Sequence, residues 1–185
     1  ILQNARPAGL CLSRQALPTL DPKVAGKLTN VRKGAYILHE SSTATPEVIL
    51  IATGSEVAIA LAAAEKLEKS KVGVRVVSMP CREWFEQQTA AYKEKILPQR
   101  VRARVSVEAG VPLGWHDLVG DAGEVIGIDH FGASADAATL FREFGFTPEK
   151  VVAAARRSIR AVAERRSPVV PQAESAHTDF PATKS

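Results

Sequence analysis

Five consecutive apolar residues, Val48 to Ala52, are the feature that most constrains how this chain folds. A continuous apolar run of this length, bounded by turn residues, is typical of a β-strand that is buried on both faces. The segment Thr53-Gly54-Ser55-Glu56 follows, and residues 57–67 then place apolar side chains at helical spacing. A second strand pattern occupies Val74 to Ser78. Strand, helix and strand in this order predict a βαβ unit with parallel strands.

The rest of the pattern also alternates strands with helices. We expect further strands at residues 35–38, 105–108 and 125–128, and helices at 83–96 (interrupted at 87–89), 115–119, 135–144 and 147–164. Thr147, Pro148 and Glu149 suit the start of the last helix as its cap, first residue and first-turn acid. This alternation predicts a three-layer α/β/α sandwich around a mostly parallel, roughly five-stranded mixed sheet.

Other segments flank this domain. Gly9 to Leu12 has the pattern of a short buried strand, and residues 21–33, which contain proline, glycine and several charges, predict a linker. From about residue 165 the chain is polar, rich in proline and without periodicity, which predicts a disordered tail. The chain begins at Ile1 without an initiator methionine or a signal-peptide pattern, as we expect for part of a longer chain.

Composition and charge exclude several classes of protein. No run of about 18 uncharged apolar residues is present, so we expect no membrane span. Arg100, Arg102 and Arg104 alternate with apolar residues and are expected on the solvent side of an extended segment. Aromatic residues do not interleave with the arginines, which argues against a nucleic-acid partner. Cys11 and Cys81 fit neither a disulfide framework nor a metal site, and we expect both to be buried.

Ligands of parallel sheets bind beyond the carboxyl ends of the strands, and four segments are candidates on that ground. Arg14, in Ser13-Arg14-Gln15, has a guanidinium fork that suits a phosphate, although the pattern alone favours an ordinary surface ion pair. The Thr53–Glu56 segment opens a helix and could hold an anion. A helix start capped by Ser55 is the favoured interpretation of that segment.

The other two candidates follow later strands. Glu108 and His116 could transfer protons, but the favoured interpretation is a carboxylate bonded to backbone amides and a half-buried histidine. Asp129 and His130 are adjacent, so along an extended backbone they point to opposite sides and do not form a pair. Ser134 is expected to cap the helix that follows. The residues taken one by one therefore predict no complete catalytic set.

Taken together, these segments resemble the transketolase family in the family's own order. The resemblance covers about Ala8 to Val162, and the block from Ser78 to Phe85 is similar to actinobacterial members. The matching segments are Leu12-Ser13-Arg14-Gln15-Ala16-Leu17-Pro18, Lys33-Gly34-Ala35-Tyr36, Ile51-Ala52-Thr53-Gly54-Ser55-Glu56-Val57, Val76-Val77-Ser78-Met79-Pro80, Ser106-Val107-Glu108-Ala109-Gly110, Gly114-Trp115-His116, Ile126-Gly127-Ile128-Asp129, Phe131-Gly132-Ala133-Ser134 and Glu143-Phe144-Gly145-Phe146-Thr147-Pro148.

The resemblance implies a domain organisation and a set of cofactors. Residues 1–20 would end the pyrimidine-binding domain, 21–33 would be the linker, 34–164 the carboxy-terminal domain and 165–185 the tail. The family forms homodimers that bind thiamine diphosphate and a divalent metal, magnesium or calcium, between its first two domains. The Gly-Asp-Gly metal motif of the family is absent here. We therefore expect this chain to bind neither group by itself.

The resemblance also implies an activity and one site residue. The resemblance implies a cytoplasmic transketolase of the pentose phosphate pathway, which transfers a two-carbon ketol unit from a ketose phosphate to an aldose phosphate. Arg14 matches the family arginine that grips the sugar phosphate, and this match makes the phosphate interpretation the better one. No catalytic, cofactor-binding or metal-binding residue is assigned.

The role of the chain itself has several interpretations. Alone it is expected to be inactive. As part of a transketolase chain, it is expected to support the dimer or to take part in regulating the enzyme. The alternatives are a non-catalytic dimerisation or regulatory ligand-binding module, the carboxy-terminal subunit of a split transketolase, or part of a dihydroxyacetone synthase-like enzyme.

Overall fold

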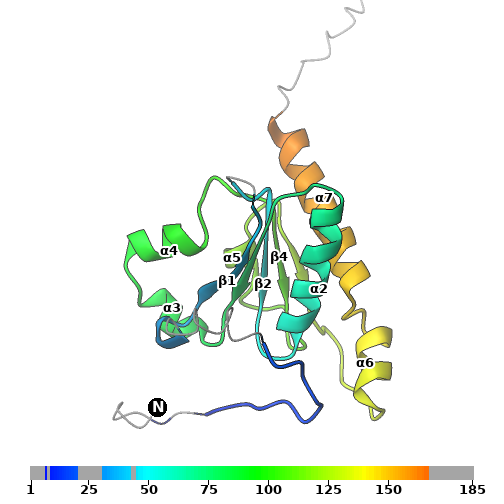
Figure 1. Ribbon diagram of the computed structural model, residues 1–185. Helices are drawn as coiled ribbons and strands as arrows, with labels where there is room; N and C mark the ends of the chain where they lie inside the picture. The colour runs from blue at the N-terminus through cyan, green and yellow to red at the C-terminus, as the bar shows by residue number, and fades with distance from the viewer. Residues whose placement is uncertain (1–6, 8, 21–30, 43–44, 167–185) are drawn as a thin grey trace, which may run out of the picture.

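The computed structural model describes residues 7, 9–20, 31–42 and 45–166, and a five-stranded sheet forms its centre (Figure 1). The order in the sheet is β1-β3-β2-β4-β5. Strand β2 pairs in parallel with β3 and β4, and β4 with β5, whereas β1 is antiparallel to β3 at one edge. The prediction of a mostly parallel mixed sheet is confirmed. The strands are β1 (Tyr36–Glu40), β2 (Val48–Ala52), β3 (Val74–Ser78), β4 (Arg104–Val107) and β5 (Glu124–Ile126).

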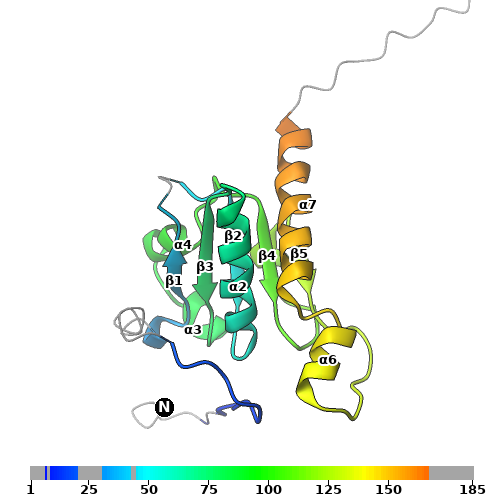
Figure 2. The same ribbon diagram turned by 45° about the vertical axis from the view of Figure 1, so that its right-hand side comes forward.

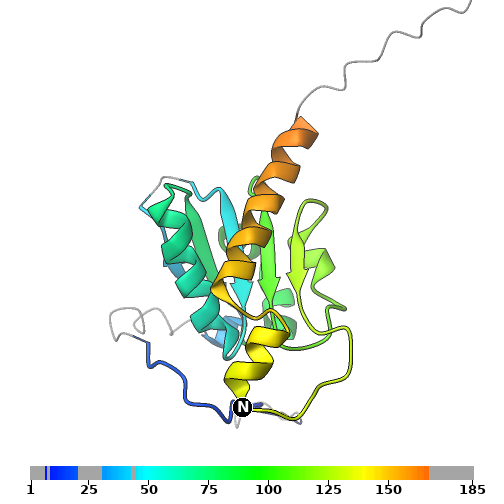
Figure 3. The ribbon, with the colours of Figure 1, turned by 90° about the vertical axis from the view of Figure 1, so that its right-hand side faces the viewer.

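Helices cover both faces of the sheet, which confirms the three-layer prediction (Figures 1 and 3). Helices α2 (Glu56–Lys69) and α7 (Pro148–Arg166) contact each other on one face, and α6 (Ala137–Glu143) lies near the start of α7. The other face carries α3, α4 and α5, and the predicted break in the 83–96 helix separates the first two. Their bounds are Arg82–Glu86, Ala90–Ile96 and His116–Val119. None of the helices in the described residues is both long and apolar enough to cross a membrane.

Strand β2 joins the two halves of the hydrophobic core. All five of its residues are fully buried. Val48, Leu50 and Ala52 pack into the cluster under α2 and α7, whereas Ile49 and Ile51 pack into the cluster on the opposite face. Because alternate residues of a strand point to opposite faces, an apolar run with no polar position forces cover on both sides.

The segment before the domain does not form the predicted strand. Gly9–Leu12 has no strand partner among the described residues, and the Leu10 and Leu12 side chains are 69% and 80% exposed. A strand requires a neighbour for its backbone hydrogen bonds, and this short apolar run has none here. Of the predicted linker, residues 21–30 lie outside the described residues, while 31–33 form a 3-10 turn. Helix α7 continues to Arg166, and the rest of the predicted tail also lies outside the described residues.

Two expectations about exposure are wrong. Arg104 does not face solvent: its guanidinium donates to the carbonyls of Val101, Pro98 and Leu118 at 2.9, 3.0 and 2.8 Å. Burial lowers the pKa of Arg104. The alternating pattern could not show that nearby loops leave several carbonyl groups in need of a donor. The two cysteines are not buried either, since Cys11 is exposed and Cys81 is half-buried.

Gly34 connects the 31–33 turn to β1 and lies against the start of α3. Its φ angle is +82°, and a Cβ atom would lie 2.2 Å from the carbonyl oxygen of Cys81 and 2.3 Å from the backbone nitrogen of Phe85. Its own carbonyl accepts a hydrogen bond from the Cys81 amide at 3.1 Å. Both the backbone angle and the close approach of α3 therefore require glycine.

We expect Gly34→Ala to lower the free energy of unfolding by about 2–5 kcal/mol, because positive φ strain and steric overlap each cost about 1–3 kcal/mol. Gly120→Ala is the matched control. Gly120 has a φ of +73°, but nothing lies within 4 Å of the position that its Cβ atom would occupy, so only the backbone strain applies. Urea unfolding followed by circular dichroism measures both losses. Equal losses would show that the contact with α3 contributes nothing.

Candidate functional site

The chain path places two loops side by side at the carboxyl ends of β2 and β4. From β2 the chain crosses through α2 to β3 on one side, and it then returns through α3 and α4 to β4 on the other side of β2. The crevice between two such strands is the topological switch point, where parallel sheets bind ligands. Residues 53–56 follow β2 and residues 108–110 follow β4, so both loops border this crevice.

A buried carboxyl group, Glu56, lies in the first of these loops. Glu56 is only 4% exposed, and its Oε1 accepts a hydrogen bond of 2.7 Å from the Ser55 hydroxyl. Burial raises the pKa of Glu56, and the nearby negative charge of Glu108 raises it further, while hydrogen bonds from Ser55 and the Ala109 backbone oppose the shift. The predicted cap is therefore wrong: Ser55 makes no side-chain cap bond and donates to Glu56 instead.

The second loop holds Glu108 through an aromatic side chain. Glu108 Oε2 accepts a hydrogen bond of 2.5 Å from the indole Nε1 of Trp115, whose side chain is buried. The Glu108 amide donates to the Ile126 carbonyl at 3.1 Å. His116 is exposed, so the expectation of a half-buried histidine is wrong. The structure thus pairs the strand-end acid with Trp115 and leaves His116 at the surface.

A hollow of about 900 Å³ opens beside Glu108. Its walls include Thr53, Glu108, Trp115 and Arg82, together with part of the amino-terminal segment at Leu10. The Arg82 guanidinium is already paired, since it forms ion pairs with Glu86 and Asp117. In the described part of the chain, no group of three or more acidic, histidine or cysteine side chains is placed to hold a metal.

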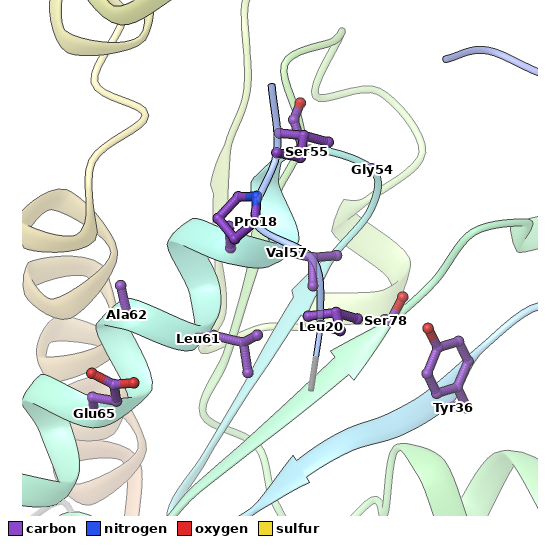
Figure 4. Close-up of a pocket in the computed structure, with 12 residues that line it drawn as sticks. Pro18, Leu20, Tyr36, Gly54, Ser55, Val57, Leu61, Ala62, Glu65 and Ser78 are labelled. Carbon is purple, nitrogen blue, oxygen red and sulfur yellow. The ribbon is translucent and has the colours of Figure 1, made fainter. Parts of the chain in front are cut away.

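Arg14, the site residue predicted from the sequence, does not line the hollow beside Glu108. Its side chain is exposed, and its backbone forms a bend. The segment that carries Arg14 runs past the end of the sheet at which the parallel strands finish (Figure 1). Three and four residues further along, Leu17 and Pro18 line a hollow together with Val57 and Leu61 of α2, and Figure 4 shows Pro18 beside this helix. The hollow that these side chains line measures about 450 Å³. The segment that carries Arg14 thus meets the domain at α2.

The structure brings no site together at the fourth candidate. Asp129 and His130 are not paired with each other, and His130 Nδ1 lies 2.8 Å from the Phe131 carbonyl oxygen. Ser134 does not cap α6, because Asp136 takes that role by accepting a hydrogen bond of 2.9 Å from the Thr139 amide. A capping residue stands directly before the first helical turn, and α6 begins two residues later than predicted.

Sequence reasoning missed the burial of Glu56. An acid in the first turn of a helix is ordinarily exposed and favoured by the helix dipole, so the Thr53–Glu56 pattern gave no reason to bury it. The available signal was indirect: Glu56 follows a strand buried on both faces, and Glu108 occupies the end of a neighbouring strand. Only the strand order β2-β4 shows that these two acids meet.

The buried Glu56 predicts a dependence of stability on pH. Because its pKa is raised in the folded chain, unfolding becomes easier as the pH rises from the ordinary value of 4.5 through the folded pKa. Glu56→Gln removes this titration and keeps an oxygen that accepts from Ser55. We expect the free energy of unfolding of Glu56→Gln, relative to the parent chain, to increase between about pH 4.5 and pH 8.

Urea unfolding at several pH values measures this difference. Glu65→Gln, which changes an exposed carboxylate on α2, is the matched control for loss of one charge. A difference between Glu56→Gln and the parent that stays constant with pH would contradict the predicted burial of the charge.

Comparison with known proteins assigns the fold to a family. The family of transketolase-like C-terminal domains matches residues 34–147, which are more than half of the chain. Transketolase of Mycobacterium tuberculosis is 52% identical over 157 residues, which are 83% of this chain and 22% of that protein. Chloroplastic transketolase of Solanum tuberosum is 50% identical over 158 residues, with 85% of this chain and 21% of that protein covered.

Solved structures agree with this assignment. Transketolase from Leishmania mexicana superposes with a TM-score of 0.66 at 39% identity, over 72% of this chain and 19% of that one. Transketolase from Pichia stipitis in complex with sedoheptulose 7-phosphate gives a TM-score of 0.68 at 33% identity. The superposition covers 82% of this chain and 21% of that one. This chain spans about a fifth of the length of the curated relatives that it matches. The chain belongs to the family of transketolase-like C-terminal domains.

Proposed function

We propose that this chain is the carboxy-terminal part of a transketolase that moves a two-carbon ketol unit from a ketose phosphate to an aldose phosphate. The observation that carries the proposal is 52% identity to a transketolase over 83% of the chain. A relative at 33% identity has been solved in complex with sedoheptulose 7-phosphate, a ketose phosphate. Residues 1–20 would then end the preceding domain, 21–33 would link it, and 34–164 would form the supporting domain of a cytoplasmic homodimer.

The residues of this chain do not fit the cofactors that the family implies. Thiamine diphosphate requires a divalent metal to hold its phosphates, and the Gly-Asp-Gly motif of the family is absent from the sequence. Among the described residues, no cluster of acidic, histidine or cysteine side chains is arranged for a metal. Glu56 and Glu108 are engaged with Ser55 and Trp115. We therefore assign the thiamine diphosphate and the metal to the remaining part of the enzyme.

Arg14 is the contribution of this chain to substrate binding. Its side chain is exposed in a bend, and a guanidinium offers a planar fork of donors that matches a phosphate group. Packing of Leu20 against the hydrophobic cluster under α2 limits how far the bend can move from the domain. Arg14 would hold the phosphate end of the sugar and orient the reacting end, without taking part in bond making.

The test uses an assembled enzyme. Residues 1–166 of this chain replace the corresponding carboxy-terminal stretch of the Mycobacterium tuberculosis transketolase, which gives a chimaera whose ketol transfer can be measured. We expect Arg14→Ala to raise KM for phosphorylated sugars about 10- to 100-fold, because a hydrogen-bonded charge contributes about 1.5–3 kcal/mol. KM for an unphosphorylated sugar of the same chain length should stay unchanged.

Two controls make this result specific. Arg100→Ala removes an exposed arginine that precedes β4, at the end of the sheet where the parallel strands begin, and should leave both KM values unchanged. Arg14→Lys keeps the charge but loses the fork, and we expect an intermediate KM. An equal rise of KM for phosphorylated and unphosphorylated sugars would remove Arg14 from the phosphate site.

A further inference from the structure

The hollow against α2 carries two buried hydroxyl groups. Tyr36 opens β1 and Ser78 ends β3, and the antiparallel register pairs these two residues directly across the strands (Figure 2). Tyr36 is 5% exposed and Ser78 is 6% exposed, and both side chains line the hollow (Figure 4). In the described part of the chain, neither hydroxyl oxygen takes part in a hydrogen bond. Since nearly all buried polar groups have a partner, these two hydroxyl groups indicate a partner from outside the chain.

The rest of the hollow is mostly apolar and large enough for a small organic molecule. Its volume of about 450 Å³ falls in the range of about 300–1,000 Å³ that is usual for small-molecule sites. Helix α2 forms one wall, on which Ala58 and Ala62 lie one turn apart and leave space beside their small side chains. Leu17, Pro18 and Leu20 form a second wall. These three residues belong to the segment that we assign to the end of the preceding domain, so the hollow lies where that segment meets this domain.

The charges around the hollow disfavour an anionic occupant. None of the described residues that line the hollow is basic, and Glu65 contributes an exposed carboxylate to its rim. This carboxylate would repel a phosphate or a second carboxylate. The Ser55 hydroxyl also lines the hollow, but it already donates to Glu56. The available donors are therefore the hydroxyl groups of Tyr36 and Ser78, which suit a neutral oxygen acceptor such as a carbonyl group.

We propose that the hollow against α2 is a binding site for a small neutral molecule with an apolar body and one carbonyl or hydroxyl oxygen. The apolar body packs against Val57 and Leu61 of α2, and the oxygen accepts hydrogen bonds from Tyr36 and Ser78. Removal of apolar surface from water supplies most of the affinity, while the two hydroxyl groups select for the oxygen. The site uses none of the groups that we assign to ketol transfer, so its test does not depend on that activity.

Three probes of nearly the same shape test the proposed chemistry. Acetophenone carries a carbonyl oxygen, isopropylbenzene has a methyl group in place of that oxygen, and benzoate has a charged oxygen in place of the methyl group of acetophenone. Each probe is titrated into the full chain while the backbone amides are followed by two-dimensional NMR. We expect acetophenone to shift the amides of residues 36, 54–62 and 78, and to bind at least about tenfold more tightly than benzoate. Equal affinities for these two probes, or no shift at these residues, which would leave water as the only occupant, would overturn the proposal.

Removal of the two hydroxyl groups tests their role in binding. Tyr36→Phe with Ser78→Ala should weaken acetophenone binding about 5- to 50-fold, because two hydrogen bonds are lost, and should leave isopropylbenzene binding unchanged. Tyr92→Phe is the matched control, since the Tyr92 hydroxyl donates to the Ala35 carbonyl at 2.8 Å on the opposite face of the sheet. This control should change the binding of neither probe. A loss of affinity that is equal for acetophenone and isopropylbenzene would refute the assigned role of the hydroxyl groups.

The melting temperature of the chain without a probe gives an independent readout. Tyr92→Phe removes a hydrogen bond that the protein makes, whereas Tyr36→Phe removes a buried hydroxyl that has no partner in the described residues. We expect Tyr92→Phe to lower the melting temperature by about 2–4 °C and Tyr36→Phe to leave it unchanged or to raise it. Equal losses would show that the Tyr36 hydroxyl is bonded within the chain, and this outcome contradicts the proposal.

A variant with a filled hollow detects a probe that binds elsewhere on the chain. Ala62→Trp places an indole ring in the hollow, and Lys69→Trp adds the same ring at an exposed position of α2 that does not line it. We expect acetophenone binding to be lost in Ala62→Trp and unchanged in Lys69→Trp, while both variants keep the circular dichroism spectrum of the parent chain. If folded Ala62→Trp binds acetophenone as tightly as the parent does, the molecule binds at another place and the proposal is refuted.

Discussion

The burial of β2 on both faces is the constraint on which the rest of the structure depends. All five of its side chains are removed from water, two toward one helical layer and three toward the other. Such a strand requires a neighbour on each side and helices on each face, and crossover connections satisfy both needs. Two successive crossovers, from β2 to β3 and from β3 to β4, place these neighbours on opposite sides of β2. Their loops therefore meet at the carboxyl end of β2, where Glu56 and Glu108 lie.

Glu56 and Glu108 help to fix the two loops through their hydrogen bonds, although burial and mutual repulsion disfavour the charge on Glu56. Burial and the neighbouring acid both raise the pKa of Glu56. Each carboxyl group nevertheless has a donor, Ser55 for Glu56 and Trp115 for Glu108. Hydrogen-bonded carboxyl groups restrain the loops that carry them, and the bond from Trp115 to Glu108 closes the loop from Ala109 to Trp115. The same loop presents Val111 and Leu113 to solvent.

Local pattern was enough to predict the sheet and its layers, because apolar periodicity reports burial directly. It failed where a side chain's role depends on distant residues. The Gly9–Leu12 run looks like a strand, yet pairing depends on a neighbour that the run itself does not encode. Arg104 alternates like a solvent-facing arginine, but carbonyl groups of two other segments surround it. Arg14 could be assigned to a phosphate only through its resemblance to a family.

The exposure of Arg14 limits how strongly this chain alone could bind a phosphate. A guanidinium in open water binds an anion weakly, because solvent and salt screen the charge and exposed ion pairs contribute about 0–1 kcal/mol. The same contact becomes stronger once its surroundings exclude water and lower the local dielectric. In the proposed enzyme, the surroundings that exclude water from Arg14 would have to come from residues outside the described part of this chain. Arg14, which is exposed in this chain, would therefore hold a sugar phosphate firmly only within an assembled enzyme.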